Sequence, residues 1–93
     1  MKKVYILPSF ERSVKKLTPQ QKELLAKGLE SFNQYLETGQ RSSGFGLKKI
    51  SQNNYEFRLD IRLRLILKAD KEAFYLVLVG DHNDVRRYLR EYR

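Results

Sequence analysis

The chain has 93 residues, enough for one small domain with its own hydrophobic core, and we expect a single domain spanning residues 1–93. It has no cysteine and one histidine, His82, which excludes disulfides, thiolate nucleophiles, cysteine-type zinc sites and histidine-rich metal clusters. We therefore expect chemistry without a bound metal or cofactor. Nineteen Lys and Arg against eleven Asp and Glu give a net charge of +8, which favours nucleic acid, anionic lipid or an acidic protein as partner.

The N-terminal residues predict a strand. Met1 to Leu7 have a basic start, but the apolar run before Pro8 is only four residues long, too short for a signal peptide or a transmembrane helix. We therefore expect a cytoplasmic protein with no membrane partner. Val4 to Leu7 are apolar and β-prone, which predicts a first strand buried in the sheet.

Two helices are predicted next. Ser9 can cap a short helix whose apolar stripe runs from Phe10 to Leu17. Thr18, followed by proline and then by Gln21 three residues on, has the pattern of a capping box that opens a second helix. Gly39 is a natural stop for that helix. The short connection predicts a helical hairpin packed on one face of the sheet.

The segment after the hairpin is a loop followed by a short strand. Residues 40–46 are polar and rich in glycine, but they are too poor a match for a phosphate-binding loop. Residues 47–50 predict a strand that places Lys48 and Lys49 on opposite faces, and residues 51–54 predict a turn.

The most regular pattern of the chain is the alternation in residues 55–68. Odd positions are apolar and even positions are almost all charged, with Ile66 as the exception, which predicts half-buried strands. The stretch is too long for one strand, so we expect a turn of odd length near residues 60–62. Arg58 and Arg64 then share the outer face, with the carboxylate of Glu56 among them. Such a face suits a polyanion, although a charged outer face is often merely solvated.

The last part of the chain predicts a central strand and a helix. Residues 74–79 are apolar at both odd and even positions, as in a strand covered on both faces. Asp84 can cap a final helix with four apolar positions and four exposed arginines. The apolar positions are Val85, Tyr88, Leu89 and Tyr92, and the arginines are Arg86, Arg87, Arg90 and Arg93.

The order of these elements, with three local patterns, resembles the RelE/ParE superfamily of toxins from toxin-antitoxin modules. The patterns lie at residues 47–50, at residues 55–66, where an arginine stands before and after the turn, and at residues 78–85. The resemblance implies an α+β, RelE-like fold. In that fold an N-terminal strand and helical hairpin pack on one face of a small, mostly antiparallel curved sheet, and a short helix ends the chain.

The resemblance implies an endoribonuclease, or mRNA interferase, that needs no metal, cuts mRNA at the ribosome and is silenced by a cognate antitoxin. Arg64 and Arg58 would stabilise the phosphate, Lys48 or Lys49 would orient it or act as base, and His82 would be the acid. Glu56 is the alternative base. Further RNA contacts are expected from Lys49, Arg62, Arg86 and Arg41.

Two features depart from the nucleolytic pattern. Gly46 and Phe45 stand where many members carry an ionisable residue, and Val85 is followed by Arg86 instead of tyrosine. Tyr88 is nearby, but its apolar position favours a core role.

Other functions remain open at this point. His82 could simply buttress the last helix, and the same fold serves ParE-type toxins that bind DNA gyrase. Clustering of Lys48, Arg58, Arg64 and His82 would favour the nuclease, and their dispersal would favour the gyrase binder. A non-catalytic RNA-binding module is the third reading, which the buried parity of Tyr55 and Phe57 disfavours.

Overall fold

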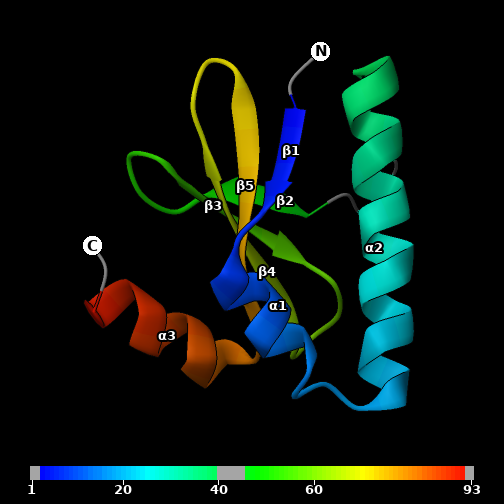
Figure 1. Ribbon diagram of the computed structural model, residues 1–93, viewed down its shortest axis with the longest axis vertical. Coiled ribbons are helices and arrows are strands. Elements are labelled where there is room, and N and C mark those ends of the chain that lie inside the picture. The colour runs from blue at the N-terminus through cyan, green and yellow to red at the C-terminus, as the bar shows by residue number, and fades with distance from the viewer. Residues whose placement is uncertain (1–2, 40–45, 92–93) are drawn as a thin grey trace.

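The computed structural model describes residues 3–39 and 46–91, which form a five-stranded mixed sheet with helices on both faces (Figure 1). The elements in chain order are β1 (Lys3–Ile6), α1 (Pro8–Val14), α2 (Pro19–Thr38), β2 (Leu47–Lys49), β3 (Asn54–Arg58), β4 (Arg64–Ala69), β5 (Ala73–Gly80) and α3 (His82–Glu91). The sheet order is β1-β5-β4-β3-β2, with β1 parallel to β5 and the other neighbours antiparallel. The predicted fold class is confirmed.

The larger core lies between α1, α2 and the face of the sheet that carries the odd residues of β3 and β4. Phe32 of α2 is its centre, with its ring 5.2 Å from Phe74, 6.0 Å from Phe57 and 6.3 Å from Tyr35. Leu65 and Leu67 of β4 are fully buried in the same cluster. The alternation in residues 55–68 thus predicted the buried face correctly, and the helical hairpin packs on it as expected.

The opposite face of the sheet is only partly open, which the alternation did not predict. Ile66, the one apolar residue among the even positions, is 0% exposed and packs with Val77 and Val85 under α3. Figure 1 shows α3 (red) and α2 (cyan) on opposite sides of the strands. Ile66, the exception in the alternation, therefore gives the outer face an apolar centre on which α3 packs.

The first strand is not buried, in contrast to the sequence prediction. β1 is an edge strand, and Val4, Tyr5 and Ile6 are 38%, 47% and 56% exposed. Its apolar run has the composition of a central strand, but β1 has a single neighbour, β5. The ring of Tyr5 stacks on Tyr75 of β5, with 5.5 Å between the centroids, a pair that the sequence analysis missed.

The starts of the two N-terminal helices differ in how well they were predicted. α2 has the expected capping box between Thr18 and Gln21, and it ends at Gly39 in the left-handed conformation with φ of 72°. α1 begins at Pro8, earlier than expected, with Leu7 at its N-cap. Ser9 is therefore not the cap.

The hydroxyl of Ser9 has a tertiary role instead. It donates at 2.6 Å to the carbonyl of Val77, the residue of β5 that the register with β4 skips at a bulge. Because the bulge leaves that carbonyl outside the ladder, Ser9 satisfies a group that would otherwise lack a partner. Ser13 of α1 accepts from the N–H of Val79 at 3.0 Å, so two serines attach α1 to β5.

The turn between β3 and β4 has the predicted odd length. Arg58 pairs with Arg64, and the N–H of Leu59 donates to the carbonyl of Leu63 at 2.9 Å. The carboxylate of Asp60 accepts from the backbone N–H groups of Arg62 and Leu63, which fixes the turn. The two arginines therefore lie side by side on one face, as expected.

Candidate functional site

Four of the predicted site residues lie on one face of three neighbouring strands. Lys48 of β2 is directly opposite Glu56 of β3, and Arg58 of β3 is directly opposite Arg64 of β4. Residues opposite each other in antiparallel strands have Cβ atoms about 5 Å apart. We call Lys48, Glu56, Arg58 and Arg64 the basic row. It lies on the face that also carries α3, toward the β2 edge of the sheet.

Arg64 is the most enclosed member of the basic row. Its Nε lies 3.7 Å from Oε1 of Glu56, and the two side chains are 13% and 18% exposed. Its Nη1 donates to the carbonyl of Asp60 at 3.0 Å. The buried Nε has no hydrogen-bond partner among the described residues. Arg64 is thus fixed by the hydrogen bond of its Nη1, whereas its Nε–H makes no hydrogen bond to the residues that the structure describes. A guanidinium that binds an anion needs such a donor.

Arg58 and Lys48 are the open members of the basic row. Both are exposed, so they can reach a ligand without displacing neighbouring side chains. Gly46 precedes β2 and lies against Arg58; a Cβ there would be 3.1 Å from the Cβ of Arg58. The glycine, where many nucleolytic members carry an ionisable residue, therefore gives Arg58 room.

His82 lies at the same end of the sheet as Arg64. Arg64 pairs with Gly80, the last residue of β5, and His82 follows two residues later as the first residue of α3. The side chain of His82 is exposed. The imidazole of His82 therefore lies at the start of α3, and both it and Arg64 lie at the same end of the sheet.

The start of α3 is fixed by a reciprocal cap that the sequence analysis assigned to the wrong aspartate. The carboxylate of Asp81 accepts from the N–H of Asp84 at 2.9 Å, and that of Asp84 accepts from the N–H of Asp81 at 3.0 Å. Asp81 is therefore the cap, and Asp84 occupies the third helical position. The spacing of two acidic residues three apart is the signal that identifies such a pair.

The cap has electrostatic and steric consequences. The hydrogen bond from the N–H of Asp84 is the main cause that lowers the pKa of Asp81 below its usual value. Gly80 allows the cap to approach β5 closely, because a Cβ at that position would lie 2.7 Å from the Cβ of Asp84. A larger residue at Gly80 would therefore shift the start of α3 and His82 with it.

The remaining predicted residues lie away from the basic row or outside the described residues. Lys49 pairs with Tyr55 and so lies on the opposite face of the sheet, which makes Lys48 the better candidate of the two. Arg62 is exposed in the turn between β3 and β4, and Arg86 is exposed on α3. Arg41 and Phe45 lie outside the described residues.

Tyr88 of α3 packs against the small cluster that contains Ile66, and its hydroxyl donates to the side chain of Asn54 at 3.4 Å. A structural role for Tyr88, as expected, accounts for both contacts.

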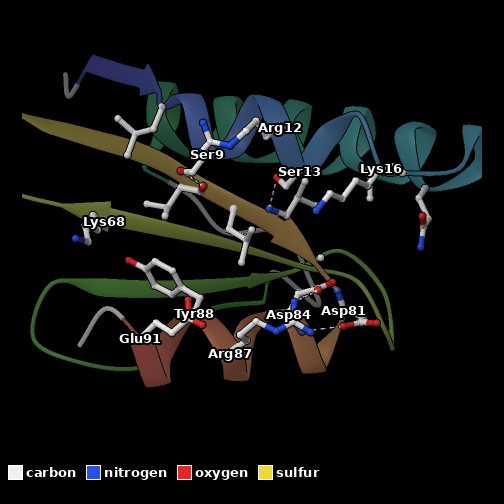
Figure 2. Close-up of a pocket in the computed structure, with 17 residues that line it drawn as sticks. Ser9, Arg12, Ser13, Lys16, Lys68, Asp81, Asp84, Arg87, Tyr88 and Glu91 are labelled. Carbon is white, nitrogen blue, oxygen red and sulfur yellow. Dashed lines mark hydrogen bonds and ion pairs between the residues drawn. The ribbon is translucent and has the colours of Figure 1, made fainter.

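A groove of about 600 Å³, which the sequence patterns did not predict, lies between α1 and α3, on the far side of α3 from the basic row. Figure 2 shows its two walls, formed by α1 with Ser9, Arg12 and Lys16 and by α3 with Arg87 and Tyr88. Its floor is the second half of β5, and none of the four residues of the basic row lines it.

Neither a metal cluster nor a membrane span is found in the described residues. No group of three or more His, Cys, Asp or Glu side chains in residues 3–39 and 46–91 is arranged to hold a metal ion. No helix in these ranges has the length and apolar character needed to cross a bilayer.

Comparison with known proteins identifies the fold. No family model and no curated protein sequence matches the chain. Solved structures of toxins from toxin-antitoxin systems do match over nearly its whole length, and the chain has their RelE-like fold.

Three of these structures are similar at low sequence identity. The RelB-RelE antitoxin-toxin complex from Methanococcus jannaschii contains a chain with a TM-score of 0.68 and 12% identity, over 90% of this chain and 96% of that one. The DinJ-YafQ complex of E. coli gives 0.64 and 13%, over 91% and 98%. A copper-bound mutant toxin from Helicobacter pylori gives 0.61 and 18%, over 91% and 99%.

Proposed function

We propose that this protein is the toxin of a toxin-antitoxin module and acts in the cytoplasm as a metal-independent endoribonuclease that cuts mRNA at the ribosome. The observation that carries the proposal is the basic row: Lys48, Arg58 and Arg64 are gathered on one face with the carboxylate of Glu56 among them. Three of the four residues whose clustering would favour the nuclease over a gyrase-binding toxin, Lys48, Arg58 and Arg64, lie together, whereas His82 lies only at the same end of the sheet as Arg64. The RelE-like fold supports the proposal, and the cognate antitoxin is the expected protein partner.

The reaction is a transfer of one phosphoryl group within the RNA strand. The ribose 2′-oxygen forms a bond to the adjacent phosphorus, and the bond from phosphorus to the 5′-oxygen of the next nucleotide breaks. A base must take the 2′-hydroxyl proton, and an acid must give a proton to the departing 5′-oxygen. The products are a 2′,3′-cyclic phosphate and a 5′-hydroxyl end.

The basic row supplies the charge stabilisation that this reaction needs. Arg64 and Arg58 would bind the two non-bridging oxygens of the phosphate, where negative charge increases in the transition state. The Nε of Arg64 has no hydrogen-bond partner among the described residues, and a phosphate oxygen that displaced the Glu56 carboxylate would accept from it.

The proton transfers fall to the neighbours of the arginines. Glu56 is the better base, because a carboxylate can accept a proton, whereas the ammonium of Lys48 has no lone pair with which to do so. Lys48 would then orient the phosphate. His82, exposed at the start of α3, would protonate the 5′-oxygen.

The substitution Arg64→Ala tests the proposal. We expect loss of mRNA cleavage and of growth inhibition by about 10²-fold or more, because a donor to the transition-state charge is removed. The measurement is induced expression followed within minutes by mapping of new 5′-hydroxyl ends in total RNA. The matched control is Arg90→Ala, which removes an exposed arginine on α3 and should leave cleavage unchanged.

Each alternative function gives a distinct result. Full activity of Arg64→Ala would exclude the basic row as the catalytic site. Growth arrest by the wild type with intact mRNA and halted DNA synthesis would instead identify a gyrase inhibitor. New ends that carry a 5′-phosphate would contradict the metal-independent transfer.

A further inference from the structure

Ile61 is the apolar residue of the alternation in residues 55–68 that does not pack in a core. The other odd positions of that stretch are buried or half-buried, whereas the side chain of Ile61 is 87% exposed, in the turn between β3 and β4. In the described part of the chain, the other large apolar residues with high exposure all belong to the edge strand β1. The packing of the fold therefore gives no reason for an isoleucine at this position.

The residues on both sides of Ile61 hold the turn in place. Leu63 is buried, and Leu59 packs on α2, where a Cβ at Gly28 would overlap its side chain. Between them, the carboxylate of Asp60 accepts from two backbone N–H groups of the turn, at 2.9 and 2.6 Å. Ile61 is thus carried by a turn whose backbone is already fixed, so a ligand that packs on it has little further ordering to impose.

The turn between β4 and β5 has the same hydrogen bonds but a different tip. The carboxylate of Asp70 accepts from the N–H groups two and three residues further on, as that of Asp60 does. The residue after Asp70 is the exposed Lys71. Because the same turn forms with a lysine, its geometry does not require an isoleucine after Asp60. The apolar tip occurs at the turn that adjoins the basic row and not at the turn at the other end of β4.

The turn between β3 and β4 is directly attached to the candidate catalytic guanidinium. Nη1 of Arg64 donates to the carbonyl of Asp60 at 3.0 Å, and Arg58 and Arg64 form the last pair of strands β3 and β4 before the turn. Ile61 is three residues from each arginine, so its Cα lies within about 11 Å of theirs. A nucleotide whose phosphate lies between the two arginines can therefore bring its own base, or that of its neighbour, to the tip of the turn.

We propose that Ile61 is a specificity-determining residue that packs against the face of a nucleobase next to the scissile phosphate. An aliphatic side chain has no hydrogen-bonding group, so it contacts the apolar face of a base and not the donors and acceptors of its edge. Arg62, exposed beside it, provides a positive charge for a neighbouring phosphate. The inference deepens the proposed function and rests on it, because the base belongs to the RNA strand that the basic row would cut.

A contact with a base would give the toxin a means of selection that the basic row lacks. The cations of the basic row bind phosphate, which is the same at every nucleotide and carries no sequence information. A side chain that packs on a base makes cleavage depend on how that base is presented beside the phosphate. Ile61 would therefore help to decide which phosphate of the strand enters the site.

The test removes either the side chain or the base. The variant is Ile61→Ser, and the control is Ile6→Ser, which removes an exposed isoleucine from β1, at the other edge of the sheet from β2. The substrates are a defined mRNA on the ribosome and two forms of it. Each form lacks the base of one nucleotide that flanks the scissile phosphate but keeps its ribose 2′-hydroxyl. Single-turnover cleavage is measured against toxin concentration, after thermal unfolding confirms that each variant is folded.

We expect Ile61→Ser to reduce the ratio of the cleavage rate to the half-saturating concentration by about fivefold to tenfold on the complete mRNA, because apolar contact area is lost. On one of the base-free forms, the variant and the wild type should differ by less than about twofold, since the partner of the side chain is already absent. Ile61→Phe should cleave the complete mRNA at least as well as the wild type, because an aromatic ring stacks on a base. Ile6→Ser should match the wild type on every substrate.

Two results would overturn the inference and leave the proposed function standing. One is wild-type cleavage by Ile61→Ser. The other is an equal loss by Ile61→Ser on the complete and on both base-free mRNAs, which would place the contact on the ribosome or on the sugar-phosphate backbone. A wild-type toxin that leaves the complete mRNA intact would overturn the proposed function and the inference together, so the wild-type reaction alone tells the two failures apart.

Discussion

The guanidinium of Arg64 has two kinds of neighbour. Its Nη1 is engaged by the carbonyl of Asp60 at 3.0 Å, whereas its Nε faces Glu56 at 3.7 Å, beyond hydrogen-bond distance. The first contact fixes the side chain and the second neutralises part of its charge. A phosphate that reaches Nε would compete with Glu56 for Arg64 and so free the carboxylate to accept a proton. In the proposed reaction this one ion pair would link charge stabilisation with base catalysis.

The substitution His82→Gln tests the proposed role of His82 as the general acid. Glutamine keeps a polar side chain at the start of α3 but cannot act as a general acid. We expect the rate of RNA cleavage to fall by about 10²- to 10⁴-fold. The measurement is the single-turnover rate of RNA cleavage by the wild type and the variant under the same conditions.

The thermal stability of the His82 variant serves as the control. The side chain is exposed, so the midpoint of unfolding should change little. A wild-type rate of cleavage by the variant would return His82 to a structural role at the helix start.

At the scale of elements, α3 is held to the sheet by few contacts. Val85 is its one buried residue among residues 82–91, and its start depends on the Asp81–Asp84 cap. The helix therefore has less packing than α2, which buries Leu25 and Phe32 in the main core. Because His82 belongs to α3, the geometry of the candidate site depends on one of the less firmly held elements.

The cap makes the stability of α3 depend on pH. The pKa of Asp81 is lowered in the folded state, mainly by the hydrogen bond from the N–H of Asp84. A lowered pKa means that the cap stabilises the fold fully above the unfolded value of about 3.9 and that this contribution is lost as the pH falls through the folded value. We expect the amides at the start of α3 to lose protection from hydrogen exchange as the pH falls below about 4.

The variant Asp81→Ala is the reference for this titration. It should show weak protection of the same amides already at neutral pH, with little further change on acidification. Equal acid sensitivity of the variant and the wild type would show that the loss arises elsewhere in the chain.

At the scale of the whole molecule, one aromatic centre joins the helical hairpin to the sheet. Phe32 is 1% exposed and contacts the rings of Tyr35, Phe57 and Phe74. We expect Phe32→Ala to lower the free energy of unfolding by about 3–5 kcal/mol, a large part of the stability of a small domain. Urea denaturation followed by circular dichroism measures this change.

The conservative variant Phe32→Leu should cost less, because it leaves a smaller cavity. A loss below about 1 kcal/mol for the alanine variant would contradict the central place of this ring in the core. Both variants also serve as references for loss of activity through unfolding, with which loss of activity through substitution in the basic row can be compared.

The sequence by itself determined the buried face, the odd-length turn and the shared face of Arg58 and Arg64. Each follows from the two-residue period of residues 55–68, because one side of a strand must be apolar where helices cover it. The capping box of α2 was equally local. Such features depend on neighbours in the chain, so the order of residues is enough to predict them.

Only the tertiary structure decided the edge position of β1, the packing of α3 over Ile66 and the assignment of Ser9 to the carbonyl of Val77. It also placed Lys49 away from the basic row and opened the groove between α1 and α3. Strand order and helix placement depend on contacts between residues far apart in the chain. An apolar run such as that of β1 has the same pattern at an edge as in the centre of a sheet, and the number of its neighbours becomes known only when the sheet is assembled.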